Sequence, residues 1–390
     1  MDLIIRSGRV IDPATGVDNV LDIAVSDGRI TNVAKHVDTY EGIRILDASG
    51  CLVTPGLIDF HTHVFYGGGP WSVDADELGP RTGVTTMVDA GSAGAGNFHG
   101  FYRHVIQRSR TRIKAFLHIA FNGLEGGGIY APGDLVIAGE LDDIRRAMIR
   151  PAVEVGQKYP DAICGIKVRA SVEAAGESGS IAIDLAKQAS ELLNLPVMVH
   201  IGAPPPTRKE ILKKLRPGDV LTHAFRGHPN GPYNLDGSVM EEMLEARSRG
   251  VLFDVGHGQG SFAFASGQKL IRDADFLPDM ISSDVHTYSV GTTAHNLPRT
   301  MSKFLALGMD LMEVIRATTV TPAEFLGVEG TLGSLRAGYL ADISVLKLRN
   351  QDVTFHDTFG ETMDAQQVLA PVATIRDGEV VWSELPVGET

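Results

Sequence analysis

The sequence of 390 residues contains little cysteine and no excess of basic residues. Its two cysteines, Cys51 and Cys164, exclude a disulfide framework and a multi-cysteine zinc site, and they fit a reducing compartment. The formal net charge of −13 argues against a surface for nucleic acid or an anionic membrane, because such a surface needs clustered Lys and Arg. We therefore expect neither a nucleic-acid nor a membrane partner.

Long apolar runs are also absent. No stretch approaches the roughly 20 apolar residues of a membrane-spanning helix, and the start, MDLIIRSGRVIDPATG, turns polar too early for a signal peptide. The chain has 43% hydrophobic and 21% charged residues, which is ordinary for a globular protein. Its length suffices for one large domain and a smaller one. These features predict a soluble, cytoplasmic protein.

The two ends of the chain resemble each other and differ from the middle. Short β-rich segments joined by turns fill residues 1–53, as in NVLDIAVSDGRI, and recur in residues 333–390, as in PVATIRDGEVVWS. Both quoted segments contain an Asp-Gly pair, which is a strong signal for a β-hairpin. We therefore predict that the two ends form one small β-sandwich domain.

Residues 54–332 contain eight short apolar runs, most of them separated by helical patterns such as IAIDLAKQASELLNL. The runs are GLIDFHTH, GVTTMVDAG, RIKAFLHIA, CGIKVRA, PVMVHIG, DVLTHAF, VLFDVGHG and MISSDVH. Repeated β-then-α units imply parallel strands, and eight units can close a (β/α)₈ barrel. A doubly wound open sheet is the alternative. Polar groups at the carboxyl ends of nearly all eight runs favour the barrel, with one central mouth.

The first run ends in DFHTHVF, which places His61 and His63 one residue apart. Alternate side chains of a strand share a face, so Asp59, His61 and His63 point the same way, with the two histidine backbones about 7 Å apart. Two imidazoles in this arrangement can bind one metal ion. Two solvated histidines at a strand end are the alternative, and this motif alone does not decide between them.

Four more ionisable side chains lie at or beside the ends of later runs, namely Lys167, His200, His223 and Asp284. Barrel enzymes place their catalytic groups at this end of the strands. Each residue also has an ordinary explanation: a hydrogen-bonded histidine, a lysine that reaches solvent, or an aspartate that caps a helix. A chance gathering of all six residues on one rim is the weaker explanation.

The chemistry of this set suits two divalent ions. Four imidazoles and one carboxylate suit Zn²⁺ or a similar ion, and four histidines exceed what one open catalytic zinc site needs. Two ions about 3.5–4 Å apart need an anionic bridge, which an ammonium group cannot supply. A buried, neutral Lys167 can add CO₂ and form a carbamate whose two oxygens bind both ions.

This ordered set resembles that of the amidohydrolase superfamily, in its two-metal, carboxylated-lysine subtype, which includes dihydroorotases, hydantoinases and D-aminoacylases. The resemblance runs from PGLIDFHTH to the closing GSLRAGYLADISVL. It implies that His61, His63 and Asp284 hold the more buried ion and that His200 and His223 hold the more exposed one. Carboxylated Lys167 would bridge the two ions.

A hydrolytic mechanism follows from this arrangement. A water between two cations is acidified into a hydroxide at neutral pH, and Asp284 would accept its proton and pass it to the leaving group. The more exposed ion would polarise the scissile carbonyl. We therefore predict hydrolysis of an amide or ester.

Three further residues are candidates for contacts with the substrate. Arg169 shares the face of Lys167, so its guanidinium either binds a substrate carboxylate or pairs with an acidic neighbour such as Asp89. His257, in DVGHG, is predicted to contact substrate or an oxyanion, with the glycines leaving room for a ligand. His286 is predicted to contact substrate or to orient Asp284 from behind.

Two other polar residues are less specific. Asp59 is expected to support the metal ligands from one step deeper in the strand, and His118, at the end of the third run, is ambiguous. The glycine clusters YGGGP and EGGGIY lack the ending of a phosphate loop and are predicted to be active-site loops.

Within the superfamily, CGIKVRAS, MVHIG, LTHAFRG and DVGHG look most like the deacetylase branch. This resemblance implies removal of an acyl group from a small carboxylate-bearing amine or alcohol. A cyclic amide, as in dihydroorotases and hydantoinases, is the alternative substrate. A non-catalytic scaffold would be expected to have lost metal ligands, and none is lost here. The terminal domain's exposed edges also make a homo-oligomer an expectation.

Overall fold

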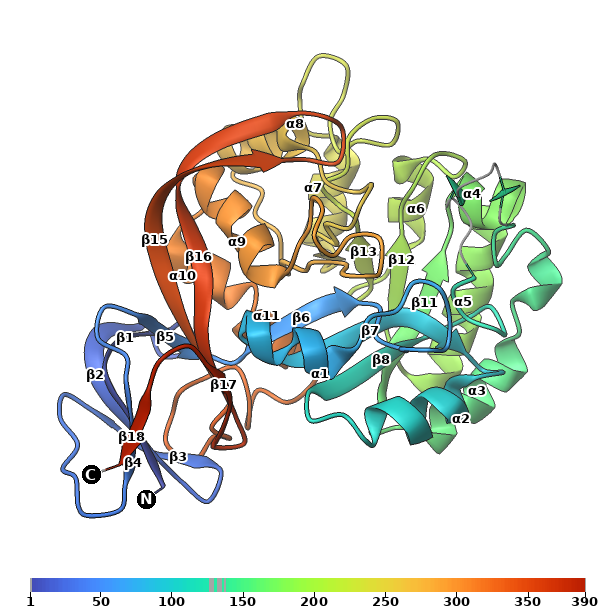
Figure 1. Cartoon of the computed structure of the whole chain (residues 1–390). Coiled ribbons are helices and arrows are strands. Elements are labelled where there is room, and N and C mark those ends of the chain that lie inside the picture. Colours follow the sequence, from blue (N-terminus) through green and yellow to red (C-terminus); the bar gives the residue numbers. More distant parts are fainter. Residues whose placement is uncertain (1, 126–129, 132–134, 137, 390) are drawn as a thin grey trace.

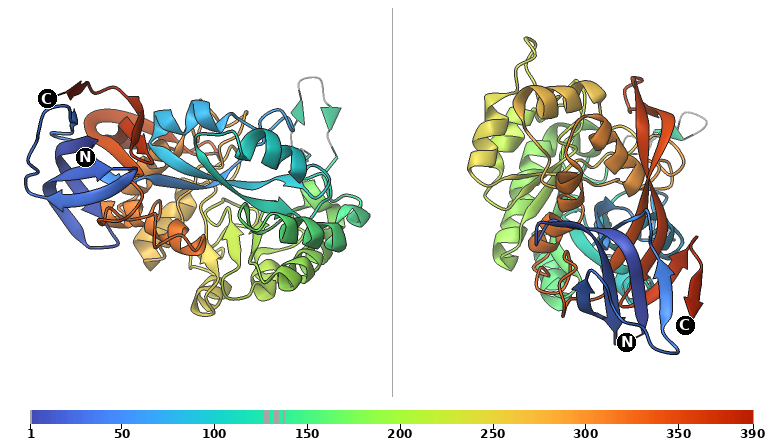
Figure 2. Two further views of the ribbon diagram at one scale, coloured as in Figure 1. Left: turned by 90° about the horizontal axis from the view of Figure 1, so that it is seen from below. Right: turned by 90° about the vertical axis from the view of Figure 1, so that its left-hand side faces the viewer.

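The computed structural model describes residues 2–125, 130–131, 135–136 and 138–389 (Figure 1). Most of the EGGGIY loop therefore lies outside the described residues. The described part contains a curled parallel sheet surrounded by helices and a second sheet built from both ends of the chain (Figures 1 and 2). No helix of this part has the length and apolar character to cross a membrane.

Seven parallel strands form the first sheet, and each strand pairs with the next one along the chain. They are β6 (Leu57–Thr62), β7 (Val84–Gly94), β8 (Arg112–His118), β11 (Ile163–Arg169), β12 (Val197–His200), β13 (Val220–Thr222) and β14 (Leu252–Phe253). Consecutive parallel pairing with helical crossovers is the pattern of a (β/α)₈ barrel, which confirms the predicted fold class.

The eighth apolar run closes the barrel without forming a regular strand. Isolated parallel bridges join Met280 to Asp254, beyond β14, and Val285 to Thr62 on β6. The amide of Asp284 also donates to the carbonyl of His61 at 2.7 Å. Asp284 has a φ of +48°, so extended backbone geometry breaks at the residue that carries the predicted ligand.

Helices connect the strands and cover the outside of the barrel (Figure 2). The α-helices are α1 (Ala75–Leu78), α2 (Phe98–Phe101), α3 (Ile149–Lys158), α4 (Val172–Ala175), α5 (Gly179–Leu193), α6 (Arg208–Lys214), α7 (Glu241–Ser248), α8 (Phe264–Gly267), α9 (Leu297–Ala306), α10 (Leu311–Arg316) and α11 (Val320–Phe325). Helix α6 begins with a capping box between Thr207 and Glu210, as its sequence TRKE favours. The two-residue strands β9 (Tyr130–Ala131) and β10 (Leu135–Val136) pair antiparallel in a separate two-stranded sheet.

The second sheet contains nine strands and branches at β1, which pairs with three others. The strands are β1 (Leu3–Asp12), β2 (Val17–Ser26), β3 (Arg29–Ala34), β4 (Arg44–Asp47), β5 (Leu52–Pro55), β15 (Ile343–His356), β16 (Thr362–Arg376), β17 (Glu379–Ser383) and β18 (Val387–Glu389). Strand β5 pairs with β15 and so joins the two ends of the chain, as the sequence predicts. The boundaries 1–53, 54–332 and 333–390 stay a prediction, and β5 spans the first of them.

The β15–β16 hairpin extends beyond the rest of the terminal sheet. It extends from the terminal domain along α9, and its turn lies beside α8 (Figure 1). The amide of Leu369 on β16 donates to the hydroxyl of Ser302 on α9 at 2.9 Å, which ties the hairpin to the barrel.

Candidate metal centre

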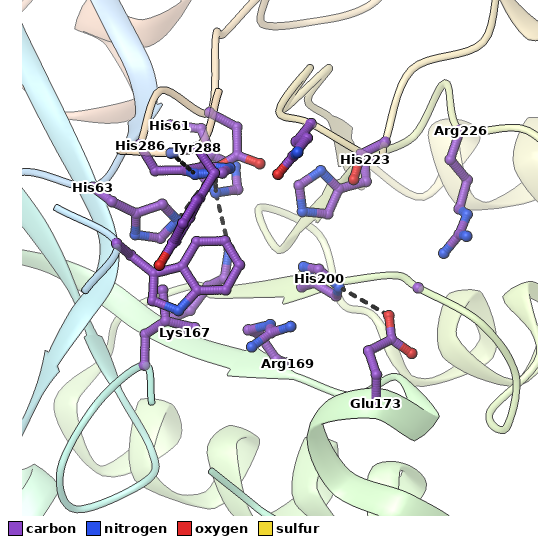
Figure 3. Close-up of a pocket in the computed structure, with 17 residues that line it drawn as sticks. His61, His63, Lys167, Arg169, Glu173, His200, His223, Arg226, His286 and Tyr288 are labelled. Atoms are coloured by element: carbon purple, nitrogen blue, oxygen red, sulfur yellow. Dashed lines mark hydrogen bonds and ion pairs between the residues drawn. The ribbon is translucent and has the colours of Figure 1, made fainter. Parts of the chain in front are cut away.

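All six predicted ligands line one cavity of about 520 Å³ at the carboxyl ends of the barrel strands (Figure 3). They come from β6, β11 and β12, from the residues that directly follow β6 and β13, and from the eighth segment. Arg169 and His286 line the same cavity. The fold therefore brings together side chains that are spread over more than half of the sequence.

Three of these residues form a compact group. The potential ligand atoms of His61, His63 and Asp284 all lie within 4.8 Å of one another. Asp284 Oδ1 is 3.4 Å from His61 Nε2 and 3.2 Å from His63 Nε2. Two imidazoles and a carboxylate at this spacing match the protein ligands of a divalent ion.

The remaining three predicted ligands lie next to this group. The rings of His200 and His223 have centroids 4.3 Å apart, and the ring of His223 is 5.1 Å from that of His61. Lys167 Nζ is 3.5 Å from His61 Nε2, and its side chain is almost fully buried. Lys167 is therefore placed where it can contact ligands of the first group.

Hydrogen bonds fix the orientation of three histidines through Nδ1. This atom lies 2.8 Å from Thr222 Oγ1 in His61, 2.9 Å from Ser92 Oγ in His63 and 2.7 Å from the carbonyl of Gly256 in His223. Each ring thus has its Nε2 available for a ligand, an arrangement typical of metal-binding histidines.

A buried polar chain continues behind His61. Thr222 Oγ1 donates to Asp254 at 2.7 Å, so it accepts from His61, and Ser282 Oγ donates to the same carboxylate at 2.6 Å. Sequence reasoning missed Thr222 and Asp254. Their only signal was a polar residue at the end of the runs DVLTHAF and VLFDVGHG.

Asp59 supports the eighth segment. Its carboxylate accepts from the backbone amide of Ser283 at 2.9 Å and from the Ser283 hydroxyl at 2.5 Å. Because Ser283 precedes Asp284, Asp59 holds the backbone that presents the ligand.

Burial determines the protonation of the centre. It lowers the pKa of His63 to about 3 and the pKa values of His61, His200 and His223 well below their usual value, so all four imidazoles are neutral and able to bind metal. Burial also lowers the pKa of Lys167 to about 7. It raises the pKa of the Asp284 carboxyl to about 6.

Two ligand atoms have no hydrogen-bond partner among the described residues. They are Nε2 of His200 and Oδ1 of Asp284, and both are buried. A buried polar atom without a partner is costly, and a bound cation would satisfy both atoms. Together with the neutral imidazoles, these atoms show that the residues fit divalent metal ions.

The backbone around the centre is constrained. His223 and Asp284 have φ values of +64° and +48°, which are uncommon outside glycine and cluster at functional sites. A Cβ added to Gly256 would lie 2.4 Å from Thr222 Oγ1, and one added to Gly258 would lie 2.3 Å from Asp284 Oδ2. The glycines of DVGHG therefore make room for the ligands and their supports.

One wall of the cavity carries a buried ion pair. Arg169 Nη1 lies 3.1 Å from Glu140 Oε2, and His118 Nε2 lies 3.5 Å from Glu140 Oε1. Burial alone would raise the pKa of Glu140, but Arg169 and His118 hold it below its usual value. The sequence suggested Asp89 as the acidic neighbour, whereas the Asp89 carboxylate accepts three backbone N–H groups. Glu140 had no signal in the sequence.

His257 and His286 occupy different environments. His257 is fully buried outside the cavity lining, with Nε2 2.7 Å from Lys303 Nζ and Nδ1 3.0 Å from the carbonyl of Gly258. This geometry does not support the predicted substrate contact. His286 lines the cavity against Trp71, and its Nδ1 accepts from the amide of Tyr288 at 3.2 Å.

Arg226 is a second arginine of the cavity, and sequence reasoning missed it. Its Nη1 donates to the carbonyl of Ile201 at 3.3 Å, while its buried Nε has no hydrogen-bond partner among the described residues. Glu173, also in the lining, has an unpaired buried Oε2, and its Oε1 is 3.9 Å from His200 Nε2 (Figure 3). The signal for Arg226 was its place three residues after His223, in LTHAFRG.

Comparison with known proteins agrees with this geometry. Residues 52–381 match the model of the amidohydrolase family. A deacetylase of Agrobacterium fabrum is 34% identical over 355 residues, which cover 91% of this chain and 85% of that protein. A deacetylase of Brucella anthropi is 33% identical over 365 residues, or 93% of this chain and 88% of that protein.

Solved structures extend the likeness to the whole fold. A structure described as an adenine deaminase has a TM-score of 0.87 and 31% identity, and it covers 98% of this chain and 100% of its own. One described as a dihydroorotase has a TM-score of 0.87 and 32% identity, with 98% and 99% covered. The match to the family model and the barrel with its His, His and Asp group lead to one conclusion: this chain belongs to the amidohydrolase family and is a hydrolase.

Proposed function

We propose that the protein is a cytoplasmic two-metal hydrolase that removes an acetyl or other acyl group from a small N-acyl or O-acyl carboxylate. The observation that carries the proposal is the meeting of four neutral imidazoles, Lys167 and Asp284 in one buried pocket, with unpaired ligand atoms on His200 and Asp284. We propose Zn²⁺ as the metal, because imidazoles and carboxylates suit it.

We propose a role for each of the six residues. His61, His63 and Asp284 would hold one ion and His200 and His223 the other, with Lys167, carboxylated by CO₂, between them. When bound, two such ions supply an acidified water and a polarised substrate carbonyl. Asp284, which lines the cavity, would accept a proton there and deliver it to the leaving amine or alcohol.

The substrate carboxylate would lie at the charged side of the cavity. The guanidinium of Arg169 already has Glu140 as a partner, whereas the buried Nε of Arg226 has no partner among the described residues. We place the carboxylate at Arg226, with Arg169 and His286 as neighbouring contacts, because a buried guanidinium favours an anion. His257 is left out of this set.

Deacylation is favoured over opening of a cyclic amide. The relatives named deacetylases match about nine-tenths of the chain, whereas a dihydroorotase of Geobacter metallireducens matches over 64 residues, or 16% of it. The cyclic-amide reaction stays the second candidate, because the structure described as a dihydroorotase superimposes on nearly the whole chain. One barrel can host several chemistries, so the substrate must be measured.

A substrate panel tests this proposal. The panel contains N-acetyl-D- and N-acetyl-L-amino acids, O-acetyl hydroxy acids, hydantoins and dihydroorotate. We expect turnover of at least one acyl carboxylate by the wild type and no turnover by Lys167→Ala. Turnover of the cyclic amides alone would overturn the deacylase assignment, and no turnover by metal-loaded protein of any compound would count against both candidates.

A further inference from the structure

The turn of the β15–β16 hairpin, residues 357–361, belongs to the terminal domain but lies beside α8 of the barrel (Figure 1). The Asp357 carboxylate accepts from the amide of Phe264 at 2.9 Å. The amide of Thr358 donates to the carbonyl of Phe262 at 3.0 Å, and Thr358 Oγ1 accepts from the amide of Phe262 at 3.0 Å. Thr358 Oγ1 also donates to the carbonyl of Phe262 at 2.8 Å, so four hydrogen bonds attach this turn to residues 262–264.

The contacted residues directly follow two segments that line the cavity. Gln259, Gly260 and Ser261 line it and lead into Phe262, while Arg226 lines it and leads into Gly227. The ring of Phe359 packs on Gly227 so closely that a Cβ there would lie 3.1 Å from the ring. The hairpin turn therefore contacts the continuation of both wall segments.

Further hydrogen bonds join the two wall segments. The amide of Ala263 donates to the carbonyl of Phe225 at 3.1 Å, and Ser266 Oγ donates to the carbonyl of Arg226 at 2.7 Å. A displacement of one segment would therefore be passed to the other.

Lys303, on α9, also connects this wall of the cavity to the hairpin. Its side chain is almost fully buried, and its Nζ donates to the carbonyls of Thr293 at 2.6 Å and His356 at 2.7 Å. The same Nζ lies 2.7 Å from Nε2 of His257, whose ring stacks on Phe262 with centroids 4.6 Å apart. Burying a lysine is expensive, and the proposed reaction does not use this one.

We propose that Lys303 and the hairpin turn, through Phe359, are positioning elements that hold the wall segments 224–227 and 257–264 in place. Neither Lys303 nor Phe359 lines the cavity, so both act through the wall and not by contact with substrate. The C-terminal hairpin of the small domain then sets how tightly the barrel binds its substrate. This last consequence rests on the proposed function, whereas the support of the wall does not.

Hydrogen exchange followed by mass spectrometry on the full-length, metal-loaded protein tests the support of the wall. We expect amides of residues 224–227 and 257–264 to exchange about tenfold faster in Phe359→Ala and in Lys303→Met than in the wild type. Phe359 is 41% exposed, so its truncation leaves the fold intact. The matched control is Thr354→Ala, an exposed position on the same hairpin whose hydroxyl bonds Asp364 on β16.

Steady-state kinetics test the consequence for substrate. With an acyl carboxylate that the wild type hydrolyses, we expect KM to rise about tenfold in Phe359→Ala, with kcat within about twofold and metal content unchanged. A general loss of structure would instead lower kcat and metal content together.

The outcomes separate the inference from the proposed function. Unchanged exchange in Phe359→Ala, or equal acceleration in Thr354→Ala, overturns the support of the wall, whether or not any compound is turned over. Faster exchange with an unchanged KM overturns the link to substrate affinity. Failure of the whole substrate panel contradicts the proposed function, while exchange still decides the inference.

Discussion

Thr222 illustrates how single side chains control this centre. Its hydroxyl accepts from His61 and donates to Asp254. One oxygen therefore fixes the orientation of the His61 ring and makes Nδ1 the nitrogen that carries the proton. His61 and Thr222 are 161 residues apart in the sequence, and no local pattern could have paired them. His61 and His63, by contrast, share one strand end, and their spacing alone indicated a metal site.

We predict that Thr222→Val lowers metal affinity by about 10- to 100-fold, because the variant keeps the volume but loses the group that orients His61. Competition with a chelator measures this affinity. Thr54→Val, at a buried threonine of the terminal domain, is the control and should bind metal normally. Equal affinity in Thr222→Val and the wild type would show that the hydroxyl does not orient the ligand.

The Arg169–Glu140 pair leads to a prediction about stability. Arg169→Met would leave a fully buried carboxylate without its guanidinium, at a cost of about 3–5 kcal/mol in the free energy of unfolding. Denaturant unfolding measures this cost. The double variant Arg169→Met/Glu140→Gln should recover much of the loss, because no buried charge is then left unpaired. A fully stable single variant would contradict the structural role of the pair.

At the scale of elements, the parallel strands and the turns could be predicted, because their signals are local. The two Asp-Gly turns have positive φ at both residues and connect β2 to β3 and β16 to β17. The irregular eighth segment could not be predicted, because its apolar run looks like a strand and its break depends on the φ of Asp284. The contact of the β15–β16 hairpin with the barrel could not be predicted either, since strand patterns do not reveal what a strand packs against.

A substitution at Gly258 tests whether the absence of a side chain there keeps Asp284 in position. An alanine there would have to adopt a φ of +51° and would place Cβ 2.3 Å from Asp284 Oδ2. We predict that Gly258→Ala lowers kcat by about 100-fold while the fold is retained, because a displacement of about 1 Å at a catalytic group has such effects. Gly218→Ala, with a φ of +84° and no atom within 4 Å of the new Cβ, separates backbone strain from displacement of Asp284. Similar activity in the two variants would refute this role of Gly258.

For the whole molecule, the terminal segments and the barrel together form the proposed enzyme. Strand β5 leads from the terminal sheet into β6, which carries His61 and is followed directly by His63. The turn of the β15–β16 hairpin bonds residues 262–264, which follow lining residues of the cavity. The sequence indicated one domain from both ends and a barrel between them. It did not indicate contact between the terminal domain and the cavity wall, because those contacts join residues about one hundred positions apart.

The central claim is a two-metal centre that carries out hydrolysis, and metal content measured together with turnover tests it most directly. We predict about two divalent ions per chain in the active wild type. Both ions and turnover should be lost in Lys167→Ala, and chelated wild type should regain both when metal is returned. An active protein that contains no divalent ions, or full turnover by Lys167→Ala, would contradict the account.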